Sequence, residues 1–130
     1  MRSEDHRKAA TALLAAEAQR SQISLLSLAN PDMDINDAYA IQKEILAVKT
    51  KAGKKIIGWK IGLTSKAMQS ALNIDIPDSG ILFDDMLFPH QGYVPKCKFI
   101  QPRIEAEIAF VFKVLLRISS LSSSSRLEYL

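Results

Sequence analysis

Two acidic side chains late in the sequence are the first candidates for chemistry. Glu105 and Glu107 are separated by one residue within residues 102–112, where polar and large apolar side chains alternate. This alternation predicts a strand, in which residues two positions apart share a face, so Arg103 would lie beside both glutamates. The far end of the stretch is apolar on both faces, which indicates a strand that is buried there and carries its carboxylates into the protein.

Two neighbouring carboxylates that are withdrawn from water repel each other and lose hydration. They then require a proton, an arginine or a divalent cation as compensation. Ligation by carboxylate oxygens alone suits Mg²⁺ or Mn²⁺. The alternative is that the pair belongs to the solvated face of a strand, where glutamate is usually found. From the pattern alone both interpretations stay open.

Lys60 is the second candidate, because it stands between Gly58 and Gly62. Residues 54–63 are rich in β-branched and aromatic side chains, which predicts a strand with Lys60 and the two glycines on one face. The glycines leave room around the ammonium group, which would let it reach into a pocket. A surface lysine on an edge strand would give the same pattern.

The elements that must position these residues are predicted from periodicity and turn signals. Residues 7–28 are alanine-rich with apolar positions at helical spacing, and Ser21 and Ser24 allow a second short helical start. After the turn at residues 30–34, a second helix capped by Asp34 or Asn36 should run to Gly53. A short helix over residues 66–72 follows the lysine-bearing strand.

Residues 73–101 contain several turn signals, which predict loops with short strands at residues 80–83 and 86–88. Asp84 and Asp85 are expected to be solvated or capping, since adjacent residues of a strand point apart. His90 has no second histidine nearby and is interpreted as structural or exposed. From residue 114 the sequence becomes a serine-rich, low-complexity tail.

Composition limits the class of protein. The chain has 130 residues, of which 48% are hydrophobic and 24% charged, with a net charge of +3 spread along the chain. We therefore expect one folded unit without a nucleic-acid partner. The single cysteine, Cys97, excludes an internal disulfide and a thiolate metal site, and favours a reducing cytosol. No apolar run is long enough for a signal peptide or a membrane span.

The predicted fold class is α+β, with N-terminal helices followed by a β-rich part. We expect an N-terminal helical region at residues 1–53, the start of a β-rich catalytic domain at residues 54–113, and an atypical serine-rich tail at residues 114–130.

Five motifs, taken together in this order and spacing, resemble a known family. They are residues 37–42 (DAYAIQ), 58–69 (GWKIGLTSKAMQ), 77–80 (PDSG), 83–86 (FDDM) and 101–110 (QPRIEAEIAF). The combination resembles the 2-keto-4-pentenoate hydratases of the fumarylacetoacetate hydrolase superfamily, over about residues 9–112. Within them it looks most like the 2-oxo-hept-4-ene-1,7-dioate hydratases, with 4-oxalocrotonate decarboxylases close behind.

The resemblance implies a Mg²⁺ or Mn²⁺ ion held by Glu105 and Glu107 and by a third carboxylate further along the family's chain. It implies Lys60 at the active site, Asp78 in a substrate loop and Arg103 against the substrate's carboxylate. The metal would stabilise an enolate while water adds to the double bond of a 2-oxo-4-enoic acid. Lys60 would carry the proton if burial lowers its pKa.

Family members are considerably longer than this chain, so the resemblance also implies truncation after about residue 112 and impaired activity. One alternative is decarboxylation of a 2-oxo-enedioate. Another is a non-catalytic fragment that associates through exposed strand edges. We expect a cytoplasmic homo-oligomer in either case, with a small-molecule 2-oxo acid as the partner of an active enzyme and no membrane partner.

Overall fold

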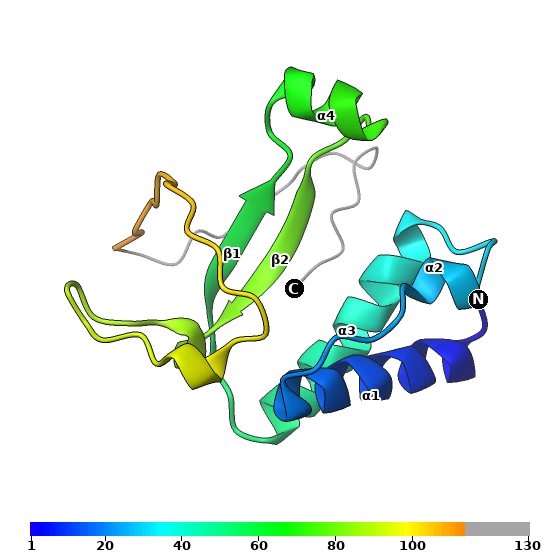
Figure 1. Ribbon diagram of the computed structural model, residues 1–130, viewed down its shortest axis with the longest axis horizontal. Helices are drawn as coiled ribbons and strands as arrows, with labels where there is room; N and C mark the ends of the chain where they lie inside the picture. Colours follow the sequence, from blue (N-terminus) through cyan, green and yellow to red (C-terminus); the bar gives the residue numbers. More distant parts are fainter. Residues whose placement is uncertain (114–130) are drawn as a thin grey trace.

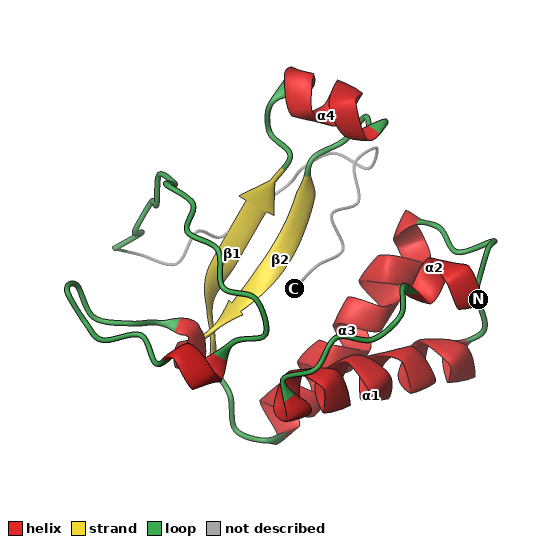
Figure 2. Ribbon diagram, viewed as in Figure 1, coloured by secondary structure: helices red, strands yellow, loops and turns green. Residues whose placement is uncertain are grey.

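The computed structural model describes residues 1–113 of the chain, which form helices and a small sheet (Figure 1). In chain order the elements are α1 (Ser3–Gln19), α2 (Leu26–Ala29), α3 (Ile35–Lys51), β1 (Ile56–Gly62), α4 (Lys66–Leu72) and β2 (Asp78–Phe83), followed by two 3₁₀ turns, η1 (Asp84–Met86) and η2 (Lys96–Lys98). Figure 2 shows the two long helices lying along one another, with the two strands beside them. The predicted α+β class is confirmed.

The core lies between α1 and α3. Ala9 and Ala10 of α1 and Ile41 of α3 are buried in contact with one another. Small alanine side chains favour helix formation and let the partner helix come near. Partly buried apolar residues from α1, α3 and the segments next to them surround this cluster; they are Met1, Leu13, Leu26, Met33 and Ile45.

Both ends of α3 are closed as the sequence predicts. The Asp34 carboxylate accepts a hydrogen bond of 2.9 Å from the Asp37 amide, and the Asp37 carboxylate accepts one of 3.2 Å from the Asp34 amide. This reciprocal arrangement is a capping box. After the last residue of α3, Gly53 adopts a φ of +90°, in the left-handed region where a side chain would be strained.

The first predicted helix is too long at its C-terminal end. α1 ends at Gln19, and Arg20 takes a left-handed φ of +54°. The amides of Arg20 and Ser21 bond back to carbonyls of Glu17 and Ala16, which closes the last turn. The possible second start becomes the short α2. The C-terminal end of α1 is not evident in the sequence because arginine, rather than glycine, occupies the left-handed position.

The sheet consists of β1 and β2 paired antiparallel, with an irregularity in the register between Ile56 and Gly58. Helix α3 contacts the outer edge of β2. The Ser79 amide donates to the Tyr39 hydroxyl at 3.1 Å, and the Gln42 side-chain amide donates to the Ser79 carbonyl at 3.0 Å. Two side chains of α3 therefore satisfy the backbone groups that a further strand would otherwise bind.

Asp84 and Asp85 close the base of the sheet, which agrees with their predicted capping role. The Asp84 amide donates to the Lys55 carbonyl at 2.9 Å, and the Asp84 carboxylate accepts from the Lys55 amide at 3.2 Å. Asp85 forms an ion pair of 2.8 Å with Lys54. These contacts hold the connection between α3 and β1 against the end of β2.

Two predicted strands are absent from the described part of the chain. Residues 86–88 begin in a 3₁₀ turn, and residues 102–112 have no regular structure. In the second segment Ile104 is 101% exposed and Val111 92% exposed. Alternation places side chains on faces, but a strand also needs a hydrogen-bonding neighbour, and residues 1–113 provide none for this segment. The serine-rich tail lies outside the described residues.

No helix among residues 1–113 is long and apolar enough to cross a membrane.

Candidate functional site

Lys60 of β1 and the two glutamates of residues 102–112 meet in space. The Lys60 ammonium donates a hydrogen bond to Oε1 of Glu107 and lies 3.6 Å from Oε2 of Glu105. Their side chains are 47% exposed for Lys60, 65% for Glu105 and 58% for Glu107. The predicted association of these three residues is present, but the expectation that a buried strand carries the carboxylates into the protein is wrong.

The charge on Lys60 is reinforced by this contact. The hydrogen bond that Lys60 donates to Glu107 is the main cause that raises the pKa of Lys60 above its ordinary value, and both glutamate charges add to it. Burial opposes the shift but is outweighed. The condition for Lys60 to act as a proton carrier, a pKa lowered by burial, is therefore not met in this structure, where Lys60 is a persistent cation.

The register of the sheet places Asp78 on the same face as Lys60. Lys60 lies opposite Gly80, and Gly62 lies opposite Asp78, so all four residues share that face. A side chain at Gly80 would meet no atom within 4 Å, which shows open space in front of Lys60. This face therefore carries a cation and a carboxylate on neighbouring strands.

The other candidates do not join this group. Arg103 is exposed and has no ion pair within residues 1–113. His90 is exposed, in agreement with its interpretation, and Cys97 is a free, exposed thiol. The structure thus brings together Lys60, Glu105 and Glu107, with Asp78 on the adjoining strand.

A metal ion would find an incomplete set of ligands here. Within the described residues no group of three or more His, Cys, Asp and Glu side chains could hold a metal. However, Glu105 and Glu107 already converge on one cation, the Lys60 ammonium. Mg²⁺ is often held by only one or two carboxylates, with water and substrate oxygens filling the other positions. The two glutamates therefore fit one part of a magnesium site.

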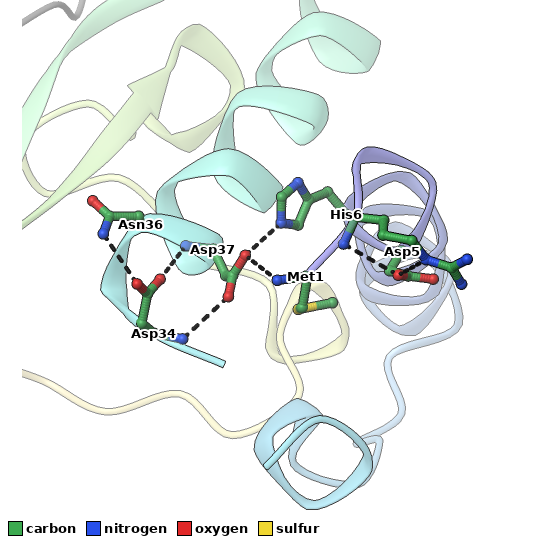
Figure 3. A network of polar contacts seen from close by, with 7 residues as sticks. Met1, Asp5, His6, Asp34, Asn36 and Asp37 are labelled. Atoms are coloured by element: carbon green, nitrogen blue, oxygen red, sulfur yellow. Dashed lines mark hydrogen bonds and ion pairs between the residues drawn. The ribbon is translucent and has the colours of Figure 1, made fainter. Parts of the chain in front are cut away.

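A second polar cluster, around Asp37, is buried between the long helices (Figure 3). Oδ1 of Asp37 lies 2.7 Å from Nε2 of His6 and accepts a hydrogen bond of 2.9 Å from the amino group of Met1. The hydrogen bond with His6, followed by that with the amino group, lowers the pKa of Asp37 from 3.8 to about 2. These contacts join the start of α1 to the start of α3, which is a structural role.

Sequence reasoning missed the residues that fix the edge of the sheet. In the sequence Tyr39 and Gln42 stand out only as part of a motif, yet their side chains bind the backbone of Ser79, the neighbour of Asp78. A signal was present, because residues three apart in a helix lie on the same face. What the sequence does not reveal is which backbone that face meets.

Comparison with known proteins gives the family. No protein-family model matches the chain. A 2-oxo-hept-4-ene-1,7-dioate hydratase of Escherichia coli is 50% identical over 102 residues, which cover 78% of this chain and 38% of the relative. The matched part of the chain belongs to this hydratase family. A 2-keto-4-pentenoate hydratase of Paraburkholderia xenovorans is 40% identical over 111 residues, or 85% of this chain and 41% of the relative.

Solved structures agree with this assignment. A 4-oxalocrotonate decarboxylase from Pseudomonas putida G7, complexed with calcium and acetate, has a TM-score of 0.64 and 33% identity over 65% of this chain and 33% of its own. The same enzyme complexed with magnesium and adipate has a TM-score of 0.63. This hydratase-like chain spans well under half the length of the curated relatives named above.

Proposed function

We propose that this chain supplies part of the active site of a divalent-metal hydratase that adds water to a 2-oxo-4-enoic acid. The first substrate to test is 2-oxo-hept-4-ene-1,7-dioate, after the relative that is 50% identical. The observation that supports the proposal is the convergence of Glu105 and Glu107 on the Lys60 ammonium. A site that gathers two carboxylates around one cation has the chemistry to hold a metal and an anionic substrate together.

Glu105 and Glu107 would hold the metal, for which we propose Mg²⁺, with Mn²⁺ as the alternative. When bound, the ion would polarise the 2-oxo group of the substrate and so favour enolate formation. Lys60, as a persistent cation, would attract the anionic substrate and its developing negative charge. Asp78 would accept a hydrogen bond from the attacking water through its carboxylate, and Arg103 would bind a substrate carboxylate.

Binding of the metal and of an enolate mimic tests the site without requiring turnover. Isothermal titration with Mg²⁺ and then with oxalate should give saturable binding of both. Glu105→Gln and Glu107→Gln should each weaken Mg²⁺ binding by at least about tenfold, because each removes one charged ligand. Lys60→Gln should keep Mg²⁺ binding and weaken oxalate binding.

The control for this titration is Glu4→Gln, which removes an exposed carboxylate paired with Lys8 on α1. It should bind Mg²⁺ like the parent chain. Equal affinities for the parent chain and the two site variants would contradict the proposed ligands, as would the absence of saturable Mg²⁺ binding.

Decarboxylation is the second candidate, supported by the structural likeness to 4-oxalocrotonate decarboxylase. Both reactions use an enolate next to a metal, but they break different bonds. Incubation with a 2-oxo-enoic acid and with a 2-oxo-enedioate, followed by product analysis, separates them. A hydrated product supports the hydratase, and release of carbon dioxide supports the decarboxylase.

Self-association is a further proposal, in which the chain forms a homo-oligomer through its strand edges. Within the described residues, β1 pairs only with β2, which leaves its other edge without a strand. Trp59 and Ile61 of β1 are 50% and 52% exposed, which adds apolar surface for association. Light scattering after size exclusion should give a mass above that of one chain. A monomeric mass at every concentration would contradict the proposed oligomer. The absence of activity on either substrate would contradict the proposed enzyme. We propose the cytosol as the location, since the exposed thiol of Cys97 is free.

A further inference from the structure

Gly62 and Asp78 face each other across the sheet, and the contact between them is unusually close. A Cβ atom built on Gly62 would overlap Oδ1 of Asp78 and would lie 3.2 Å from its Cγ. Ordinary contacts between carbon atoms are about 3.5–4.0 Å long. The carboxylate of Asp78 therefore occupies the space in which any other residue at position 62 would place its side chain.

The backbone at Gly62 gives no separate reason for glycine. Gly53 is the glycine with a positive φ, and Gly62 has a backbone conformation open to other residues. What the position requires is the absence of a side chain. That requirement comes from the Asp78 carboxylate.

The backbone of Asp78 is not free to move away from an added side chain. The next residue, Ser79, is held on both its amide and its carbonyl by Tyr39 and Gln42 of α3. On the other side Asp78 is held by its pairing with β1. The clashing Oδ1 atom is at the end of a flexible side chain, so rotation of the Asp78 side chain costs less than a shift of this backbone.

We propose that Gly62 is a positioning residue. The space left by its missing side chain lets the Asp78 carboxylate lie across β1, over the face of the sheet that carries Lys60. The substrate role of the Asp78 carboxylate rests on the proposed function, whereas the inference about its orientation is independent of that function. The Tyr39 and Gln42 contacts make the positioning effective, because they prevent the strand from absorbing a change at position 62. Gly62→Ala should turn the carboxylate away and leave the fold intact.

The direct test is the χ1 angle of Asp78, measured from NMR three-bond couplings in labelled full-length chain. We expect one rotamer in the parent chain and a different one in Gly62→Ala. The matched control is Gly58→Ala on the same strand and face, where an added Cβ would lie 3.9 Å from Cδ1 of Leu82, an ordinary contact. It should keep the parent rotamer. An unchanged Asp78 rotamer in Gly62→Ala would overturn the proposal.

A double-mutant cycle with Asp78→Ala gives a second readout, based on the urea midpoint of unfolding. Any cost of Gly62→Ala should disappear when Asp78→Ala removes the carboxylate. If Gly62→Ala alone does not fold, the double variant should still fold. An equal cost in both backgrounds, or failure of both to fold, would show that position 62 needs glycine for another reason.

Oxalate binding in the presence of Mg²⁺ separates this inference from the proposed function. Gly62→Ala should change the affinity for oxalate, because it moves a negative charge on the face of the sheet that carries Lys60, whereas Gly58→Ala should not. A changed Asp78 rotamer without any change in oxalate binding supports the positioning and contradicts the substrate role of Asp78. An unchanged rotamer contradicts the positioning, whatever the oxalate titration gives.

Discussion

The helical pair and the sheet of this chain differ in how far each is self-sufficient. Helices α1 and α3 bury Ala10 and Ile41 to 2% exposure between them, and α3 is closed at both ends. In β1, by contrast, Ile57, Trp59 and Ile61 are all about half exposed. A helix satisfies its backbone hydrogen bonds internally, whereas a strand depends on neighbours. The comparison teaches that stability in this chain resides in the helices, while the candidate chemistry resides in the sheet.

The largest expected effect is on the helical pair. Ile41→Ala removes the large buried side chain between α1 and α3, and such changes cost about 2–5 kcal/mol of unfolding free energy. Urea unfolding followed by far-ultraviolet circular dichroism measures it. Val48→Ala, on the same helix but 51% exposed, is the control and should change little. Equal costs for both variants would refute the view that the helices hold the stable core.

A pH titration of stability tests the polar contact between the same helices. The pKa of Asp37 is lowered to about 2, so its contribution to stability is present above its ordinary pKa of 3.8 and is lost as pH falls from there towards 2. The groups facing it are the Met1 amine, His6 and the capping Asp34.

Asp37→Asn should therefore be less stable than the parent chain at neutral pH and should lose less stability on acidification. Urea midpoints at intervals from pH 6 to pH 2 measure both effects. Asp5, Asp34 and Asp85 also have lowered pKa values, so the variant keeps part of the acid dependence. Parallel curves for the parent chain and the variant would exclude Asp37 as a source of the effect.

A smaller effect is expected at the turn that follows β1. Leu63 has a left-handed φ of +54°, which is strained for a leucine, and the buried side chain of Gln69 donates a hydrogen bond to its carbonyl. Gln69→Ala leaves that carbonyl without its partner and should cost about 1–3 kcal/mol. Thermal unfolding gives the value. Ser70→Ala, at the exposed position next to Gln69, serves as control. An equally small loss of stability in the two variants would mean that Gln69 does not support the turn.

The smallest expected effect on stability concerns the site itself. Glu107→Gln removes the hydrogen-bonded partner of Lys60, but both side chains are about half exposed, so the urea midpoint should not change measurably. The pKa of Lys60 should fall back towards its ordinary value, which NMR titration of the lysine Nζ can follow. A large loss of stability would contradict the exposed position of the pair and would make the sheet region more self-sufficient than we infer.

The sequence predicted the helices better than the sheet for a physical reason. The signals that begin and end α3 lie within a few residues of its ends: Asp34 is one of the two caps that the sequence predicts, and Gly53 is the predicted end. The strand expected at residues 102–112 was inferred from alternation alone, which carries no information on whether a hydrogen-bonding partner exists. The end of α1 at Arg20 was hidden because it lacks glycine.

The candidate site was predictable in part. The approach of Lys60 to Glu105 and Glu107 followed from the family resemblance, since these residues are distant in the chain. Their exposure and the raised pKa of Lys60 did not, because both depend on which atoms cover the side chains. The closeness of Gly62 to Asp78 required the register of the sheet, which no local pattern specifies.

The hydrogen bonds between α3 and Ser79 also restrict where a further strand can join the sheet. Tyr39 and Gln42 occupy the outward amide and carbonyl of β2 at this point, so a third strand cannot pair there. Within residues 1–113 no strand pairs with the other edge of β1, so a third strand can join the sheet there. A strand added along β1 would lie next to Lys60, so growth of the sheet would also cover this lysine.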